Sequence, residues 1–229
     1  MHIVHFAEID STSTYAKTHA ASLPDLTFVT ASYQSEGKGR QGRTWKAEKD
    51  ENLLYSLFIK NGPMVQAGPF LSLVAAVSLS EVLERDYKLA ASIKWPNDVY
   101  IDGRKIAGIL LEGIGAECLI IGMGVNVNQL SFDGEYRISP TSLALCLGEK
   151  VDLDTFQQRL FAQLLANLEE HAAKNRFLAY YREHDYLRDK KVSYEGKEYI
   201  VKGVDAEFSL LLKNETEERH IVSGEISFL

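Results

Sequence analysis

The segment from Gly37 to Trp45 joins two predicted strands, and this connection limits the folds that the chain can adopt. It reads Gly-Lys-Gly-Arg-Gln-Gly-Arg-Thr-Trp. Its glycines match the spacing Gly-x-Gly-x-x-Gly, which in a dinucleotide-binding fold follows a strand and opens a helix. A strand is predicted before the segment, at Leu26–Ala31, but residues 43–52 show no apolar stripe of helical period, and Leu53–Ile59 is predicted to be another strand. The segment is therefore not a Rossmann fingerprint, and it also lacks the Gly-Lys-Ser/Thr of a phosphate-binding P-loop.

The 37–45 loop, as we call this segment, gathers positive charge. Lys38, Arg40 and Arg43 lie between its glycines, in a chain whose formal net charge is −7. Glycine permits positive φ and close approach of the backbone to a ligand, and clustered cations favour an anion such as a phosphate or a carboxylate. The loop is predicted to hold an anionic ligand. The alternative is a solvated surface turn with incidental cations.

The length and composition are those of a globular protein with one large and one small domain. The 229 residues are 45% hydrophobic and 25% charged. No apolar run approaches the roughly 20 residues needed to span a bilayer, and the segment Met1–Phe6 has no signal-peptide pattern. Cys118 and Cys146 lie among apolar residues, so we expect free thiols in a reducing, cytoplasmic compartment rather than a disulfide.

The net charge and the spacing of the histidines argue against a nucleic-acid-binding protein and against a structural metal site. The acidic balance argues against a protein whose main partner is nucleic acid, because contacts to phosphate dominate that affinity. None of the six histidines lies with a cysteine or a second histidine at a convincing metal-ligand spacing. No metal site is predicted.

Periodicity and turn residues predict the order of helices and strands. A short strand at Ile3–Phe6 leads to a helix that runs to about Ala21, and Ser11–Thr14 offers four hydroxyl groups as caps for its start. Further helices are predicted at Pro69–Arg85, after Asp152 or Asp154, and at Phe177–His184, with strands at Leu89–Lys94, Val99–Ile101, Lys105–Leu111 and Cys118–Val127. Five short strands then predict a small, partly open barrel packed on the main domain, at Lys191–Tyr194, Lys197–Val204, Phe208–Leu212, Glu217–Val222 and Ile226–Leu229.

A second group of candidate functional residues follows the strand at residues 89–94. The block Lys94–Asp98 reads Lys-Trp-Pro-Asn-Asp, and its proline restricts the preceding tryptophan to extended conformations. A plain strand exit is the alternative, because Pro-Asn-Asp is common in turns. Asp102-Gly103 then predicts a hairpin, and Gly108 inside an apolar strand indicates close approach by a ligand or another backbone. Lys105 is either a solvated hairpin residue or a cation that reaches a phosphate.

These blocks, taken together, resemble the biotin protein ligases. The matching blocks are Gly37–Arg43 with Trp45, Lys94–Asp98, Lys105–Glu112, Gly122–Asn128 and Gly224–Ser227, in this order, and the resemblance covers nearly the whole chain. It implies an α+β fold. Residues 1–186 would form a mixed central sheet with helices, the catalytic domain of biotin and lipoate ligases that is related to class II aminoacyl-tRNA synthetases. Residues 187–229 would form an SH3-like barrel.

The resemblance also implies a reaction. Such a ligase uses ATP to activate biotin to biotinyl-5′-AMP, and then passes biotin to one lysine of a biotin carboxyl carrier domain, of acetyl-CoA carboxylase or a similar biotin-dependent enzyme. ATP and biotin are then substrates, and Mg²⁺ accompanies the ATP. We expect no nucleic-acid or membrane partner, and a monomer or a homodimer.

Site residues follow from the same resemblance. The predicted biotin contacts are Ser11, Thr12, Ser13, Gln34, Lys38, Gly39, Arg40 and Lys105, and the predicted ATP contacts are Arg40, Arg43, Trp45, Asn97 and Asn126. Lys105 and Arg40 are the predicted catalytic residues. Two positions depart from the family pattern. Ser13 stands where asparagine is common in the family. Lys38 stands where arginine is common, so a bidentate contact with a carboxylate is replaced by the point charge of an ammonium.

Two other functions remain as alternatives. A lipoate or octanoyl ligase or transferase has the same fold, but its typical Arg-Arg-x-Ser/Thr-Gly-Gly-Gly segment is missing. A DNA-binding regulator or ligand sensor is disfavoured by the acidic charge, and we expect no helix-turn-helix before the catalytic domain.

Overall fold

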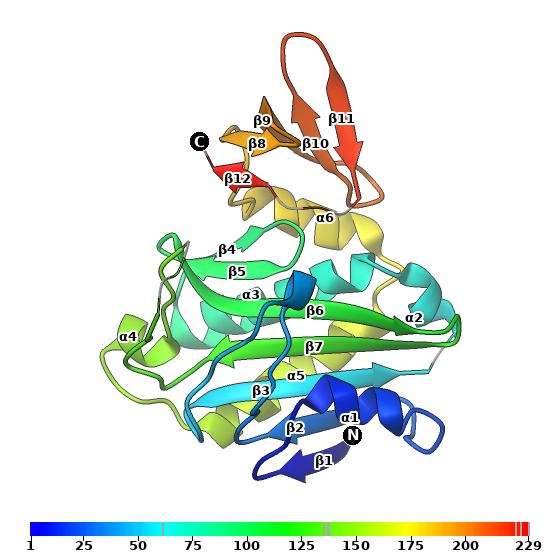
Figure 1. The fold of residues 1–229 in the computed structure, drawn as a ribbon, viewed down its shortest axis with the longest axis vertical. Coiled ribbons are helices and arrows are strands. Elements are labelled where there is room, and N and C mark those ends of the chain that lie inside the picture. The colour runs from blue at the N-terminus through cyan, green and yellow to red at the C-terminus, as the bar shows by residue number, and fades with distance from the viewer. Residues whose placement is uncertain (61, 135, 137, 223, 225, 229) are drawn as a thin grey trace.

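Two β-sheets organise the chain (Figure 1). The computed structural model describes residues 1–60, 62–134, 136, 138–222, 224 and 226–228. The larger sheet has seven strands in the order β1-β2-β3-β7-β6-β5-β4, and the smaller has five in the order β11-β10-β9-β8-β12. The pair β1 and β2 is parallel and the other pairs are antiparallel. This arrangement confirms the predicted α+β fold with a mixed central sheet and a small C-terminal β unit.

The elements follow the predicted order. The larger sheet contains β1 (His2–Phe6), β2 (Thr27–Ala31), β3 (Asn52–Ile59), β4 (Ala91–Lys94), β5 (Asp98–Ile101), β6 (Arg104–Ile114) and β7 (Cys118–Asn126). The smaller contains β8 (Lys191–Tyr194), β9 (Lys197–Val204), β10 (Leu210–Lys213), β11 (Glu218–Ile221) and β12 (Ser227–Phe228). The helices are α1 (Thr12–Thr18), α2 (Gly62–Ala67), α3 (Phe70–Tyr87), α4 (Leu143–Leu147), α5 (Leu153–Glu169) and α6 (Lys174–Glu183).

The two faces of the larger sheet are covered very differently. Successive strand residues point to opposite faces, and Phe28 joins the large core with α3 and α5 while Val29 joins a small cluster with Ala16 of α1. On the first face, Phe161 of α5 stacks on Phe28 with ring centroids 3.8 Å apart. On the second face α1 covers only part of the sheet (Figure 1). The remainder of this second face is therefore open to a ligand.

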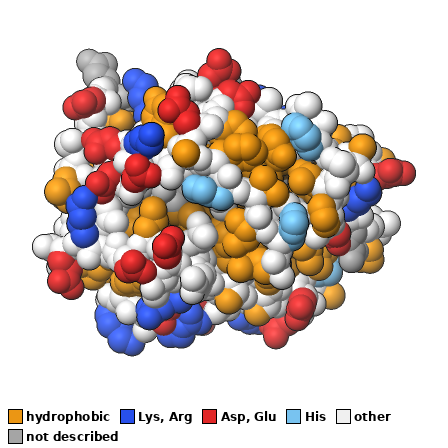
Figure 2. All heavy atoms as spheres, turned by 90° about the horizontal axis from the view of Figure 1, so that it is seen from below, with side chains coloured by type: hydrophobic (Ala, Val, Ile, Leu, Met, Phe, Trp, Pro, Cys, Tyr) orange, Lys and Arg blue, Asp and Glu red, His pale blue; other side chains and the backbone are white. Residues whose placement is uncertain are grey.

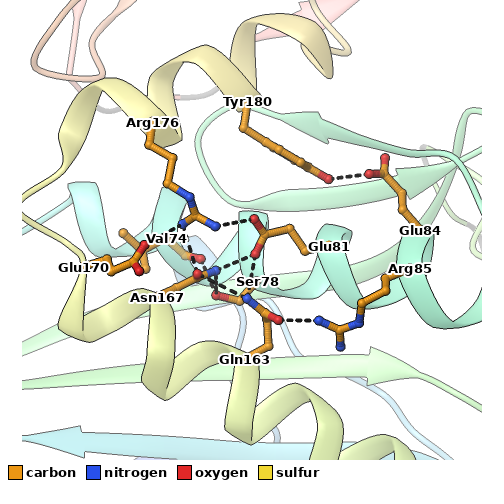
Figure 3. A network of polar contacts seen from close by, with 10 residues as sticks. All are labelled: Val74, Ser78, Glu81, Glu84, Arg85, Gln163, Asn167, Glu170, Arg176 and Tyr180. Carbon is orange, nitrogen blue, oxygen red and sulfur yellow. Dashed lines mark hydrogen bonds and ion pairs between the residues drawn. The ribbon is translucent and has the colours of Figure 1, made fainter.

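A polar network joins the helices on the covered face (Figure 3). The Glu81 carboxylate of α3 accepts hydrogen bonds from Gln163 and Asn167 of α5, and from Arg176 of α6 at 2.6 Å. Tyr180 of α6 donates to Glu84 at 2.8 Å. Charge-assisted bonds of this kind fix the relative positions of helices. The end of α6 is thereby held against α3.

The same helix leads into the contacts that hold β4. The amide of Ile93 donates to the carbonyl of His184 at 2.8 Å, and the amide of Tyr186 donates to the carbonyl of Ile93 at 3.0 Å. The outer edge of β4 is thus paired with the chain that follows α6. Next along the chain, the buried Trp95 donates its indole N–H to the carbonyl of Phe208, in the turn that leads into β10 of the smaller sheet, at 2.9 Å. The two sheets are therefore joined at the exit of β4.

The opposite edge of the larger sheet is uncovered. Among the described residues, the backbone hydrogen bonds of β1 run to β2 and to Ser32, which follows β2. Ile3 is 39% exposed, and Val4 and Phe6 are half-buried. Figure 2 looks at the molecule from this side and shows hydrophobic side chains gathered around histidines, with charged groups mostly at the margin. The strand itself contains no Lys, Asp, Glu or Pro.

Several boundaries differ from the prediction. The strand predicted at Phe208–Leu212 begins at Leu210, because Phe208 has φ +65° and lies in a turn. The first helix ends at Thr18. The short helices α2 and α4 were missed because five or six residues carry no readable period. Asp152 is the cap of α5 and accepts from the Thr155 amide at 2.8 Å. The predicted residues Glu225 and Leu229 lie outside the described part of the chain.

Two further findings concern the cysteines and the question of a membrane-spanning helix. Both cysteines are free thiols, Cys118 buried and Cys146 half-buried. Within the described residues, no helix combines the length and apolar character that a bilayer crossing requires.

Candidate active site

Glycines leave the open face of the sheet bare where β6 and β7 pair. Gly108 lies opposite Gly124, and Leu110 lies opposite Gly122. With no side chains at 108 and 124, the indole of Trp45 lies directly on the strands. A Cβ built on Gly124 would come within 2.4 Å of the indole, and one on Gly108 within 3.0 Å. Gly108 thus has the close approach predicted for it, and the approaching group is a side chain of this protein.

The 37–45 loop is folded back on itself. The Trp45 amide donates to the Gly37 carbonyl at 2.9 Å, and the Gly39 amide donates to the Arg43 carbonyl at 2.7 Å. A Cβ on Gly37 would lie 2.5 Å from the Trp45 carbonyl oxygen, so glycine is required there. Of the loop's three glycines only Gly42 has positive φ, at +74°. Glycine is therefore needed at Gly42 because of its positive φ, and at Gly37 because the backbone of Trp45 packs closely against it.

Hydroxyl and amide groups gather at the α1 end of the open face. Ser11 caps α1, and its hydroxyl lies 3.1 Å from that of Ser13. Gln34 Oε1 accepts from both the amide (2.7 Å) and the hydroxyl (3.0 Å) of Thr12. The Thr12 hydroxyl also lies 2.8 Å from that of Ser56 on β3. The result is a buried, uncharged group of donors and acceptors.

Cations gather at the other end. The ammonium of Lys105 lies 2.8 Å from the carboxylate of Asp98, and 5.6 Å from the centre of the Trp45 ring. Arg40 donates to the side-chain oxygen of Asn97 at 3.1 Å and to the carbonyl of Gly224 at 3.2 Å. Lys105 is therefore not a solvated hairpin residue, because its side chain is 30% exposed and paired.

The two predicted asparagines also serve the local structure. Asn97 donates its amide N–H to the carbonyl of Ile109, and the Ile109 amide donates back to the Asn97 carbonyl at 2.8 Å. Asn126 donates to the carbonyl of Thr141 at 2.9 Å. Both asparagines are buried. Their side chains fix the strand ends that border the cationic end.

One cavity of about 640 Å³ joins the two ends. All twelve site residues predicted from the sequence line it, namely Ser11, Thr12, Ser13, Gln34, Lys38, Gly39, Arg40, Arg43, Trp45, Asn97, Lys105 and Asn126. Among its described lining residues six are basic and two, Asp98 and Asp133, are acidic. A cavity with this balance in a chain of net charge −7 is suited to a polyanion.

The cavity also has lining residues that the sequence reasoning missed. Ser56 is a hydroxyl inside the otherwise apolar strand Leu53–Ile59, and that interruption was a readable signal. Lys94 lines the cavity as well, and the sequence marks it only as the first residue of the block Lys94–Asp98. Phe132 and Tyr136 lie in the loop after β7, with ring centroids 6.4 Å apart, and no pattern marks them in the sequence.

Two polar features bear on what the cavity binds. The indole N–H of Trp45 is buried and has no hydrogen-bond partner among the described residues. A buried donor of this kind is normally paired, so a ligand acceptor would satisfy it. Among the same residues, no group of three or more His, Cys, Asp or Glu side chains is placed to hold a metal ion.

Comparisons with known proteins identify a family to which the chain is similar. The model of the biotin/lipoate A/B protein ligase family matches residues 5–126. The bifunctional ligase/repressor BirA of Bacillus spizizenii is 37% identical over 158 residues, which are 66% of this chain and 49% of that protein. This chain therefore spans about half the length of that relative. The biotin--[acetyl-CoA-carboxylase] ligase of Paracoccus denitrificans is 30% identical over 237 residues, covering 97% of this chain and 98% of that protein.

A solved structure extends the likeness to the fold. The biotin protein ligase from Aquifex aeolicus in complex with biotin and ATP superposes with a TM-score of 0.87. It is 28% identical, and the match covers 99% of this chain and 97% of that one.

The glycine floor under Trp45 is testable by one substitution. Gly124→Ala places a methyl group 2.4–2.8 Å from three indole atoms, so we expect Trp45 to leave the sheet and become more exposed. Acrylamide quenching of tryptophan fluorescence measures this, because the second tryptophan, Trp95, is 1% exposed. Gly122→Ala is the matched control, since its Cβ would meet no indole atom. An unchanged quenchable fraction in Gly124→Ala would contradict the described position of Trp45.

Proposed function

The chain belongs to the biotin/lipoate A/B protein ligase family, and we propose that it is an ATP-dependent biotin protein ligase. It converts biotin and ATP to biotinyl-5′-AMP and pyrophosphate, and then transfers biotin to a lysine of a biotin carboxyl carrier domain, such as that of acetyl-CoA carboxylase, with release of AMP. The observation that carries the proposal is a cavity that has an uncharged hydrogen-bonding end and a cationic end. Biotin has the matching ends, a ureido ring and a carboxylate.

The polar end favours biotin over lipoate. We assign the biotin head group to Ser11, Thr12, Ser13 and Gln34, which we place around its ureido group. The dithiolane of lipoate lacks these donors and acceptors and would leave the buried polar groups unpaired. A site that loses its hydrogen-bonding partners in this way rejects the analogue strongly. Lipoate ligation is therefore the second candidate, and no observed feature of the cavity favours it.

The cationic end is suited to adenylation. The biotin carboxylate attacks the α-phosphorus of ATP, so two anions must approach each other. Lys105 and Arg40 are assigned to offset their repulsion and to stabilise the charge on the five-coordinate phosphorus. Pyrophosphate leaves, and biotin carries the AMP as a mixed anhydride. Arg43, Trp45, Asn97 and Asn126 are assigned to the nucleotide.

The 37–45 loop is assigned the role of a cover. Lys38, Gly39 and Arg40 would lie over biotin and the adenylate, which hydrolyses when water reaches it. Transfer then needs only the amine of the acceptor lysine, which attacks the acyl carbonyl and releases AMP.

Magnesium fits the cationic end as a companion of ATP. Mg²⁺ commonly binds through one or two carboxylates together with substrate phosphates. Asp98 supplies a carboxylate beside Lys105, and Asp133 is the second acidic residue of the described lining. When bound, the ion would neutralise charge on the pyrophosphate group.

The remaining assignments are of domains, compartment and partners. We propose a catalytic domain at residues 1–186 and an SH3-like domain at 187–229, which the two separate sheets support. The two free thiols support a cytoplasmic compartment. We propose no nucleic-acid partner, because the net charge is −7.

We propose that a homodimer, if the chain forms one, joins through the β1 edges of two copies. An uncovered edge strand without charged residues or proline favours strand pairing. Antiparallel pairing centred on Val4 would place Ile3 opposite His5 and His2 opposite Phe6, so no like charges face each other when the histidines are neutral.

The activity is tested by pyrophosphate exchange into ATP. We expect exchange that requires both biotin and Mg²⁺, because adenylation precedes transfer. Lipoate in place of biotin should support no exchange. Exchange with lipoate and none with biotin would overturn the assignment.

Lys105→Ala tests the catalytic lysine. We expect adenylation to slow by about 10²–10³-fold, as when a donor to a developing oxyanion is removed. Lys150→Ala is the control, because Lys150 forms a 2.6 Å ion pair with Glu51 outside the cavity and its side chain is 58% exposed. Thermal unfolding should be nearly unchanged in both. Adenylation by Lys105→Ala at the wild-type rate would remove Lys105 from the mechanism.

Sedimentation velocity tests the β1 edge. We expect a concentration-dependent dimer that Ile3→Lys abolishes. In the pairing centred on Val4 each new lysine would lie opposite His5 of the other copy and diagonal to the second new lysine, on the same face of the strand pair, so the two charges would repel. Ile200→Lys on β9 is the matched control, because Ile200 is 36% exposed on the other sheet. A wild-type chain that stays monomeric at all concentrations, or a dimer that survives Ile3→Lys, would exclude this interface.

A further inference from the structure

The last strand of the chain brings an aromatic ring close to Lys94, a cation that lines the cavity. Phe228 lies in β12, which pairs with β8 so that Phe228 is opposite Val192. Its ring centroid is 5.4 Å from the ammonium of Lys94. Lys94 lines the cavity, and its carbonyl accepts the amide of Asn97 at 3.1 Å. A residue of the smaller sheet thus contacts a cation of the catalytic cavity.

The Phe228 ring is itself held on several sides. The ring of Tyr186 meets it edge-on at 6.0 Å and 88°. The ammonium of Lys190 lies 5.6 Å from the Phe228 centroid and 3.2 Å from that of Tyr186. Tyr186 is tied to β4 through the carbonyl of Ile93. The ring is therefore fixed relative to the strand that carries Lys94.

A fixed ring matters because of the chemistry of lysine. Its ammonium is a point charge on a flexible four-carbon stem, and an aromatic face attracts such a charge when it lies within about 6 Å. Holding the charge in place before the substrate arrives removes part of the entropy cost of binding it.

We propose that Phe228 is a positioning residue that holds the ammonium of Lys94 toward the phosphate chain of ATP. The inference rests on the proposed ligase function and extends it to the smaller sheet. Lys94 is then a phosphate-binding cation, and the ring acts through it. Lys190 contacts the same ring but is not among the described residues that line the cavity.

Phe228→Leu tests the proposal, because leucine keeps an apolar side chain and removes the aromatic face. We expect the KM for ATP in biotin-dependent pyrophosphate exchange to rise about three- to tenfold, as loss of a cation–π contact implies. The KM for biotin and the melting temperature should stay near wild type. Phe228→Tyr should restore the KM for ATP.

Two further variants separate positioning from general structural support. Lys190→Met should leave the KM for ATP unchanged, although it contacts the same ring. In a Lys94→Met background, Phe228→Leu should add no further loss. A wild-type KM for ATP in Phe228→Leu, or an equal loss with and without Lys94, would overturn the proposal.

Direct measurement of ATP binding by calorimetry keeps the two proposals distinguishable. A wild-type chain without biotin-dependent exchange would refute the ligase function. Weaker ATP binding by Phe228→Leu alone supports the role of the ring, whereas equal binding by both chains refutes it.

Discussion

The structure depends on one constraint, which is that the seven-stranded sheet is buried on one face and bare on part of the other. The covered face carries the large core with α3 and α5, so the strands are fixed without help from the second face. On that second face, Gly108 and Gly124 remove the side chains that would fill the space above the strands. The indole of Trp45, from the 37–45 loop, lies on the strands at this point. The rigid helical layer behind the sheet is therefore what allows an open site in front.

The selectivity that we propose for the cavity depends on how polar groups are divided between its two ends. At one end, buried hydroxyls and an amide bond one another without any charge, so a neutral polar head group can replace contacts at little electrostatic cost. At the other end, Lys105 is paired with Asp98, and the basic residues outnumber the acidic ones. An elongated ligand with one neutral and one anionic end satisfies both ends, whereas a uniformly charged or uniformly apolar ligand satisfies only one.

The sequence was informative where chemistry is local and less so where it depends on packing. The family resemblance predicted the fold class and twelve cavity residues. Eight of the twelve lie in the motif blocks, because the glycines, cations and asparagines of a site recur at fixed spacings. The blocks could not show that Trp45 would lie on Gly108 and Gly124, since this contact joins residues more than 60 positions apart. Phe132 and Tyr136 lie in a loop without periodicity. The short helix α4 depends on its Ser142 cap and on tertiary packing, which no window of sequence reveals.

The smaller sheet contacts one end of the cavity in preference to the other. Three contacts come from its strand β12 or from the loops between its strands: the Gly224 carbonyl accepts from Arg40, the Phe208 carbonyl accepts from Trp95, and the Phe228 ring lies near Lys94. All three partners belong to the 37–45 loop or to the Lys94–Asp98 block, which border the cationic end. The hydroxyl end is instead built from α1, β3 and Gln34. The two ends of the cavity are held by different parts of the chain. A change in the packing of the smaller sheet should therefore alter the binding of the nucleotide and leave the binding of the neutral head group nearly unchanged.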